Sequence, residues 1–227
     1  MELDLVLKKL KSKKELQDID DSFLIARINE SAILNLNPRS KEFKLKFKDL
    51  RKKLREVYGV FRQVKEHRDV EVYNKIINET QANIILDLGC GLEPLNYAKQ
   101  GNLTYYCADI SKNIVKEINK YFKYDNIKDK AFLFSLVDNN LDKLPKVDLC
   151  LALKLLESLE TIKKGISKKI LEEIKANYIL VSFSKKSLAG KKIRKAGRSW
   201  FRKLLKELSY SYEIFDHGNE IFFLIKK

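Results

Sequence analysis

Hydrophobic positions in the first 80 residues recur at the three- and four-residue spacing of amphipathic helices. The stretch SKKELQDIDDSFLIARI begins at Ser12, a candidate N-cap, and places its apolar side chains at Leu16, Ile19, Phe23 and Ala26. A second stretch, KEFKLKFKDLRKKLREVYGVFRQV, has its apolar stripe at Phe47, Leu50, Leu54, Tyr58 and Phe61. Asn37-Pro38 predicts a break between them. We therefore expect a helical region over residues 1–80.

After Gln81 the pattern changes to short apolar runs that alternate with amphipathic stretches. The runs NIILDLGCG, LTYYCADI, AFLFSLVD, KVDLCLAL and NYILVSFS are typical of buried parallel strands. Helices are expected over SKNIVKEINKYFKY, KLLESL, GISKKILEEIKA and SWFRKLLKELSY, and a hairpin turning at Gly218 ends the chain. This order predicts an α/β fold over residues 81–227: a Rossmann-like, doubly wound, mostly parallel sheet whose C-terminal hairpin supplies a reversed edge strand.

Composition narrows the class of protein. Hydrophobic residues make up 44% of the 227, and no run of eighteen apolar residues or apolar signal-peptide region occurs. We expect a soluble, cytoplasmic protein with no membrane association. The three cysteines, Cys90, Cys107 and Cys150, are too separated for a disulfide scaffold or a metal site, and each sits by an apolar run. Buried free thiols are expected.

The formal net charge of +15 indicates an anionic partner, either nucleic acid or an acidic membrane surface. A lysine-rich surface like those of thermophilic proteins is the alternative. Between Lys185 and Lys206 there are ten basic residues and no acidic one, and this segregation favours binding of a polyanion over such a surface. The candidate RNA-binding residues are Lys185, Lys186, Lys191, Lys192, Arg194, Lys195 and Arg198. So basic a surface also disfavours self-association, and we expect a monomer.

The sequence Asp87-Leu-Gly89-Cys-Gly91 follows the first expected strand, as a glycine-rich nucleotide loop does. Glycine lets the backbone approach a ligand closely. A dinucleotide site prefers a third glycine at position 94, where this chain has Pro94, and no GxxxxGK[ST] phosphate loop occurs. Neither a dinucleotide nor a nucleoside triphosphate is favoured.

Acidic residues are expected at three successive strand ends, Asp87, Asp109 and Asp138. Asp87 suits the amino group of S-adenosylmethionine, Asp109 suits both ribose hydroxyls, and Asp138 is placed to meet the adenine amino group. Asp109 and Asp138 could instead cap the following helices. The arrangement matches a nucleoside without phosphate, so we predict a class I methyltransferase that binds S-adenosylmethionine. Ile110, next to Asp109, joins the cofactor-binding candidates.

The segment after the fourth strand constrains the methyl acceptor. Methylation of an adenine amine needs an Asn/Asp-Pro-Pro-aromatic loop, and cytosine C5 needs a Pro-Cys nucleophile, whereas this chain has DLCLALKLLESLE there. A ring nitrogen such as guanine N7 carries its own lone pair, so positioning suffices and no catalytic residue is required. Small-molecule methyltransferases are also compatible with this lack of motifs.

Several stretches resemble one family: DLGCGLEPL, LALKLLESLE, VSFSKKSLAGKK, SWFRKLL and GNEIFFLIKK. They are similar to motifs of the Arm/Rmt-type guanine-N7 methyltransferases of small-subunit (16S) ribosomal RNA, which confer aminoglycoside resistance. The resemblance covers about residues 50–227, with Glu93 in place of an asparagine and Ser184 in place of a proline. It implies S-adenosylmethionine as the cofactor and the small ribosomal subunit as the partner.

The resemblance also implies residue roles. It agrees with cofactor roles for Asp87, Gly89, Gly91 and Asp109. It adds Arg68 as the partner of the methionine carboxylate and Lys154, with the 182–192 loop, at the mouth where the guanine enters. Arg68 as a surface residue and Lys154 as a solvated lysine are the alternatives. A transfer RNA substrate, a housekeeping rather than a resistance role, and a non-catalytic RNA-binding scaffold also stay open.

Overall fold

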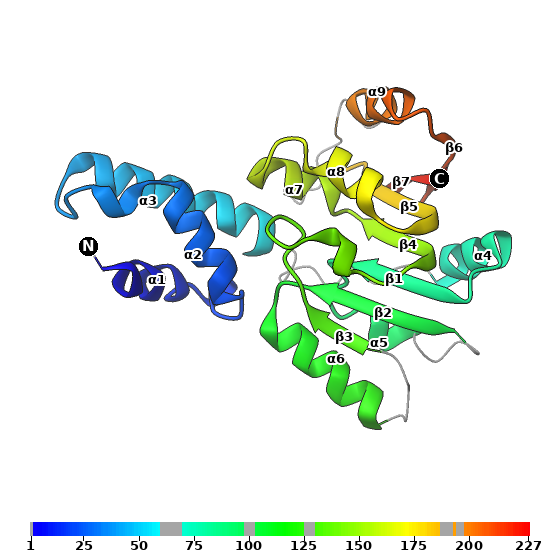
Figure 1. Cartoon of the computed structure of the whole chain (residues 1–227), viewed down its shortest axis with the longest axis horizontal. Helices are drawn as coiled ribbons and strands as arrows, with labels where there is room; N and C mark the ends of the chain where they lie inside the picture. The colour runs from blue at the N-terminus through cyan, green and yellow to red at the C-terminus, as the bar shows by residue number, and fades with distance from the viewer. Residues whose placement is uncertain (1, 60–69, 98–102, 125–129, 187–192, 194–197) are drawn as a thin grey trace.

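The computed structural model describes residues 2–59, 70–97, 103–124, 130–186, 193 and 198–227. It consists of a three-layer α/β unit and a group of helices that stands to one side of the sheet (Figure 1). We call residues 2–59 the N-terminal lobe. None of the described helices is long and apolar enough to cross a membrane.

The N-terminal lobe is helical, as expected, but the stretch predicted as a helix from Ser12 is divided between two elements, and Phe61 of the second stretch lies outside the described residues. Its elements are α1 (Leu3–Lys11), η1 (Lys14–Leu16), α2 (Asp21–Glu30), η2 (Ile33–Asn35), α3 (Lys41–Leu54) and the π-helical turn η3 (Arg55–Gly59). The predicted helix start at Ser12 is wrong, because Ser12 lies at the C-terminal end of α1. Asp20 caps α2 instead, accepting a hydrogen bond from the Ser22 N–H at 3.0 Å. The predicted break at Asn37-Pro38 separates η2 from α3.

One seven-stranded sheet follows, in the order β3-β2-β1-β4-β5-β7-β6. Its strands are β1 (Ile84–Leu88), β2 (Thr104–Asp109), β3 (Lys130–Leu133), β4 (Val147–Leu153), β5 (Ala176–Ser184), β6 (Ser211–His217) and β7 (Glu220–Lys226). Strands β1 to β5 are parallel, and β7 pairs antiparallel with both β5 and β6. The Rossmann-like fold is thereby confirmed.

The reversed strand is not the edge strand, which corrects one detail of the prediction. Strand β7 lies inside the sheet, between β5 and β6. Its residues 221–225 are all buried, as an interior strand requires, whereas the side chains of β6 are only half-buried or exposed. The hairpin therefore inserts its second strand and leaves its first strand at the edge.

Helices cover both faces of the sheet (Figure 1). One face packs against α4 (Val70–Thr80), α5 (Pro94–Tyr97) and α6 (Lys112–Tyr124). The other packs against α7 (Leu156–Ile162), α8 (Ile166–Glu173) and α9 (Ser199–Glu207), and the N-terminal lobe beside the sheet shares their hydrophobic cluster. The strand order reverses between β1 and β4, and in open α/β sheets ligands bind beside the strand ends at such a point.

Candidate functional site

Two glycines make the turn that follows β1 at this point. Gly89 and Gly91 have φ angles of +60° and +57°, in the left-handed region that favours glycine. The Gly89 N–H donates a hydrogen bond to the Ala108 carbonyl of β2 at 2.8 Å. A Cβ at Gly89 would lie 2.8 Å from Leu155 Cδ1, whereas a Cβ at Gly91 would meet no atom of the described residues within 4 Å. Gly89 thus permits close packing, and Gly91 leaves open space beside the strand ends.

Asp109 joins the end of β2 to this glycine turn. Its Oδ2 accepts a hydrogen bond from the Gly91 N–H at 3.2 Å, and its Oδ1 accepts one from the Ser111 N–H at 2.8 Å. The residue is 9% exposed. A carboxylate oxygen can accept more than one hydrogen bond. The structure therefore brings together Asp109 and Gly91, two of the predicted cofactor-binding residues.

Asp87 lies deeper than the other candidates. Its carboxylate is fully buried, and Oδ2 accepts a hydrogen bond from the Tyr105 hydroxyl at 2.8 Å. Tyr105 belongs to the cluster on the α4 and α6 side of the sheet. A buried carboxylate needs donors around it, so this hydrogen bond fixes Asp87 beneath the glycine turn. Its contact with an amino group of a ligand stays a prediction.

Asp138 does not end a strand, which corrects the prediction. Strand β3 ends at Leu133, and Asp138 lies in a turn beyond it. The apolar run continues to Val137 because Phe134, Leu136 and Val137 are buried against the cluster that contains the N-terminal lobe. The Asp138 carboxylate is ion-paired with Arg27 of α2 and accepts a hydrogen bond from the Ser135 hydroxyl at 2.7 Å.

Two of the remaining cofactor candidates, Ile110 and Lys154, directly follow the ends of β2 and β4. Ile110 is half-buried against the cluster that joins lobe and sheet. Lys154 follows β4 with a φ of +52°, and its Nζ lies 3.3 Å from Glu220 Oε1. Lys154 therefore forms an ion pair with Glu220 beside the end of β4. Arg68 falls outside the described residues.

The basic segment is described only in part. Lys186 is exposed, and Lys185 Nζ lies 3.5 Å from Asp216 Oδ2. Lys191, Lys192, Arg194 and Lys195 fall outside the described residues.

Arg198 was expected on the RNA-binding surface, and the structure corrects this. It is 3% exposed, and its Nη2 donates to Glu157 Oε2 and to the Ser184 carbonyl, both at 2.9 Å. Its guanidinium carbon also lies 5.2 Å from the centre of the Phe183 ring. The side chain is committed to packing, which a count of charges along the sequence cannot reveal.

Sequence reasoning missed two residues of the lobe that reach this edge, Arg27 and Tyr58. The pKa of Tyr58 lies above its usual range, mainly because the side chain is buried. The positive charge of Arg27 opposes this rise, and the carboxylates of Asp109 and Asp138 add to it. The phenol therefore lies within electrostatic reach of both acidic residues. One signal was present for Arg27, because it stands beside Ile28 and four residues after Phe23, on the apolar side of α2.

All three cysteines are free and buried, as predicted, and no group of acidic, histidine and cysteine side chains that could hold a metal ion occurs among the described residues. Burial raises the pKa of the Cys90 and Cys150 thiols. Neither is suited to act as a nucleophile.

Similar sequences occur among ribosomal RNA methyltransferases. Residues 64–209 match the family described as Ribosomal RNA methyltransferase (FmrO). A 16S rRNA (guanine(1405)-N(7))-methyltransferase of Serratia marcescens is 30% identical over 162 residues, which is 69% of this chain and 62% of the relative. The corresponding enzyme of Micromonospora echinospora is 26% identical over 164 residues, 69% of this chain and 59% of the relative. The chain thus spans less than two thirds of these relatives.

Solved structures extend the likeness in fold to the whole chain. The 16S rRNA methyltransferase RmtF in complex with S-adenosyl-L-homocysteine has a TM-score of 0.78 and 20% identity, covering 100% of this chain and 99% of that one. The 16S rRNA methylase RmtB also has a TM-score of 0.78, with 19% identity and the same coverage. The N-terminal lobe, which precedes the family match, therefore shares its fold with these proteins. The resemblance seen in the motifs is confirmed, and the chain belongs to the ribosomal RNA methyltransferase (FmrO) family.

Proposed function

We propose that this chain uses S-adenosylmethionine to methylate N7 of a guanine in small-subunit ribosomal RNA. The observation that carries the proposal is the hydrogen bond between the Gly91 N–H and Asp109, which joins glycine turn and carboxylate at the strand ends of a chain from this family. The names of the matching relatives specify transfer to guanine N7 of 16S rRNA, and RmtF binds S-adenosyl-L-homocysteine.

The residues present fit this cofactor. The Asp109 carboxylate can accept hydrogen bonds from the two ribose hydroxyls, and at Gly91 the ligand can approach the protein backbone closely. Ile110 offers an apolar surface to a purine ring. We assign Asp87 to the amino end of the methionine moiety, through the glycine turn that it underlies. Arg68 and Lys154 stay candidates for the carboxylate and for the mouth of the site.

The chemistry asks little of acid or base groups. S-adenosylmethionine supplies a methyl group on a sulfonium, which is already an electrophile. The N7 lone pair forms the new bond to the methyl carbon as the carbon–sulfur bond breaks, and no proton has to be removed. The chain therefore contributes by holding the guanine in line with that bond, and proximity and orientation provide the acceleration.

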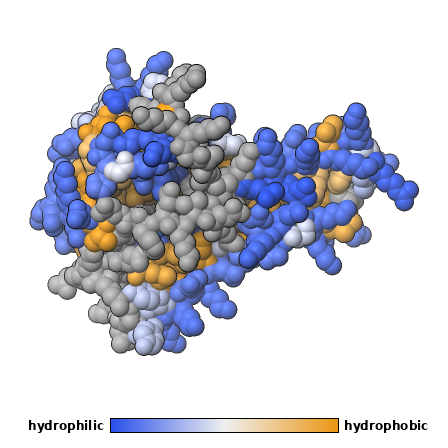
Figure 2. All heavy atoms as spheres, turned by 180° about the vertical axis from the view of Figure 1, so that it is seen from behind, coloured by the Kyte–Doolittle hydropathy of each residue, from blue (hydrophilic) through white to orange (hydrophobic). Residues whose placement is uncertain are grey.

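A basic surface supports RNA as the partner. Helix α3 carries seven basic and two acidic side chains, and Lys41, Lys44 and Lys48 are exposed on one face of it. Figure 2 shows hydrophilic side chains over most of the arm formed by the lobe. Arg202, Lys203 and Lys206 of α9 add to the charge. Basic side chains such as these can contact RNA phosphates, and such contacts fix the orientation of an RNA-binding protein. We further infer a monomer that acts on ribosomes in the cytoplasm.

The test is transfer of a tritiated methyl group from S-adenosylmethionine to purified small ribosomal subunits, with total transfer RNA as a parallel substrate. We expect label on the small subunit alone, at a guanine that borohydride and aniline cleave as 7-methylguanine. Asp109→Asn is the matched control, and it should lose transfer through weaker cofactor binding. Label on transfer RNA would reject the substrate, and RNA binding without cofactor binding would indicate a non-catalytic scaffold.

A further inference from the structure

The N-terminal lobe meets the sheet at the edge assigned to the cofactor. Ile19 forms an antiparallel β-bridge with Ser111. On either side of it, the Asp20 N–H donates to the Ile110 carbonyl at 3.1 Å, and the Lys112 N–H donates to the Asp18 carbonyl at 2.8 Å. The lobe thus pairs, backbone to backbone, with the segment that directly follows Asp109.

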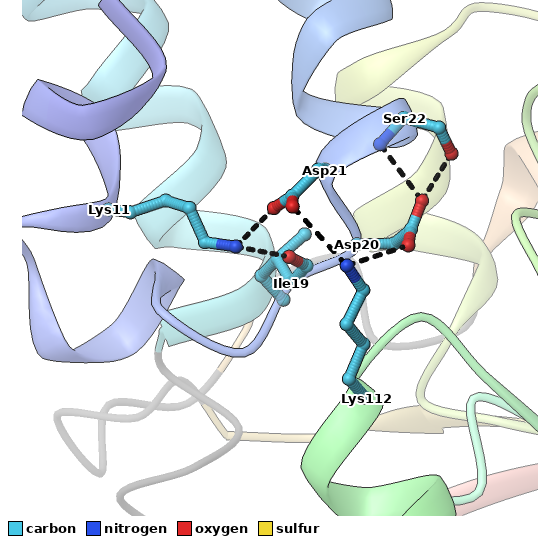
Figure 3. A network of polar contacts seen from close by, with 6 residues as sticks. All are labelled: Lys11, Ile19, Asp20, Asp21, Ser22 and Lys112. Carbon is cyan, nitrogen blue, oxygen red and sulfur yellow. Dashed lines mark hydrogen bonds and ion pairs between the residues drawn. The ribbon is translucent and has the colours of Figure 1, made fainter. Parts of the chain in front are cut away.

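Ion pairs reinforce this contact (Figure 3). Lys112 Nζ lies 3.4 Å from a carboxylate oxygen of both Asp20 and Asp21, and Lys11 is ion-paired with Asp21 as well. These side chains are partly exposed, so each pair contributes little by itself. Together they place two lobe carboxylates over the first turn of α6.

Arg27 makes the buried contact between lobe and sheet. It is 5% exposed, its guanidinium carbon lies 5.0 Å from the centre of the Phe23 ring, and Nη2 is ion-paired with Asp138. Its Nε and Nη1 have no hydrogen-bond partner among the residues that the structure describes. The same Nη2 lies 2.7 Å from Glu30 Oε1 in α2. A buried guanidinium is costly unless paired, so Glu30 holds this side chain within the lobe and Asp138 ties it to the sheet side.

The turn that Arg27 holds is attached to Asp109. The Phe134 N–H, at the start of the turn, donates to the Asp109 carbonyl at 2.9 Å. The Ser135 N–H donates to Asn139 Oδ1 at 2.7 Å and closes the turn around Asp138. The position of the 135–139 turn is therefore linked to the position of Asp109 through the backbone hydrogen bond of Phe134.

We infer that Arg27 is a positioning residue for the adenosine part of the cofactor, because it holds the 135–139 turn beside Asp109 from the N-terminal lobe. This inference rests on the proposed function. It makes docking of the lobe and binding of the cofactor one coupled equilibrium. Coupling is reciprocal, so a ligand that is bound more tightly when the lobe is docked also strengthens docking. Arg27 thereby connects the arm that carries the basic face to the site of methyl transfer.

Calorimetric titration of the full chain with S-adenosylhomocysteine and with adenosine tests the inference. Arg27→Met keeps the length of the side chain and removes its charge, and we expect about tenfold weaker binding of both ligands. The matched control is Arg55→Met, which breaks the 2.7 Å ion pair between Arg55 and Glu15 inside the lobe. This control should leave both affinities unchanged.

Reciprocity supplies a readout that loss of stability alone would not move. S-adenosylhomocysteine should slow proteolytic cleavage of the lobe in the wild-type chain and in Arg55→Met, and should fail to do so in Arg27→Met. If Arg27→Met does not fold, Asp138→Asn removes the negative charge of the same ion pair from the sheet side and should give the same two results.

The outcomes separate the two proposals. A wild-type chain that binds neither ligand overturns the proposed function, and this inference with it. A wild-type chain that binds both ligands, with folded Arg27→Met and Asp138→Asn variants of equal affinity, overturns this inference alone.

Discussion

Gly89 and Gly91 share a left-handed backbone and face different surroundings. Each has a positive φ, where a side chain costs about 1–2 kcal/mol. The Leu155 side chain fills the space beside Gly89, whereas none of the described residues fills the space beside Gly91. The two glycines of one short motif therefore serve different purposes, one the packing of β1 on the segment before α7 and the other the approach of a ligand.

Alanine at each position should separate these purposes. Gly89→Ala causes a steric clash with Leu155 in addition to the backbone strain, so it should lower the free energy of unfolding more than Gly91→Ala does. Gly91→Ala should instead weaken S-adenosylhomocysteine binding, because its Cβ enters the ligand space. Gly218→Ala, in the hairpin turn with a φ of +51°, reports the strain alone. Urea unfolding and calorimetry measure both quantities, and wild-type affinity in Gly91→Ala would contradict the assignment.

For single residues, the position at a strand end could be predicted from the sequence more readily than the burial of a charged side chain. Asp109 and the glycines could be located because a strand end restricts where they lie. Arg198 and Arg27 could not, because a buried arginine and an exposed one look alike in sequence, and only tertiary contacts with Glu157 and Asp138 distinguish them.

Individual elements follow closely from local pattern. Strands β1, β2, β4 and β5 were predictable because strands covered on both faces are apolar almost throughout. The length of β3 was not, because its apolar run continues into a turn that packs under the lobe. Insertion of β7 was also beyond the pattern, since the same hairpin could present either strand to β5. Pairing between distant elements decides such cases.

The start of α9 depends on one such pairing. Arg198 precedes the helix, has a φ of +50°, and links Glu157 of α7 to the end of β5. Arg198→Met should lower the free energy of unfolding by about 1.5–3 kcal/mol, the range for hydrogen bonds to charged groups. Lys203→Met, on the exposed side of α9, is the control and should leave stability unchanged. Thermal unfolding of both variants checks this, and equal melting temperatures would place Arg198 among the surface residues again.

The whole molecule combines a shared architecture with a segregated charge. The family match begins at residue 64, whereas the fold is shared with RmtF from end to end. Lobe and sheet are joined by one hydrophobic cluster, so the lobe is held in place by the same core that supports β1 and β4. A basic arm beside the strand ends can direct RNA toward them through its charge.

Position of charge, rather than its total, should therefore control RNA binding. Replacing Lys41, Lys44 and Lys48 of α3 with Gln lowers the net charge from +15 to +12, and so does replacing Lys116, Lys120 and Lys123 of α6. All six side chains are exposed, and each set lies along one face of its helix.

The α3 variant should bind small ribosomal subunits more weakly, and the slope of log K against log salt should fall by about one for each phosphate that the variant no longer neutralises. The α6 variant should keep the wild-type slope, because these three lysines lie beyond the first turn of α6, where that helix contacts the lobe, and α6 packs on the sheet face opposite to α7, α8 and α9. Filter binding across a salt series measures both slopes. Equal weakening in the two variants would mean that RNA responds to overall charge and that the lobe has no special part in docking.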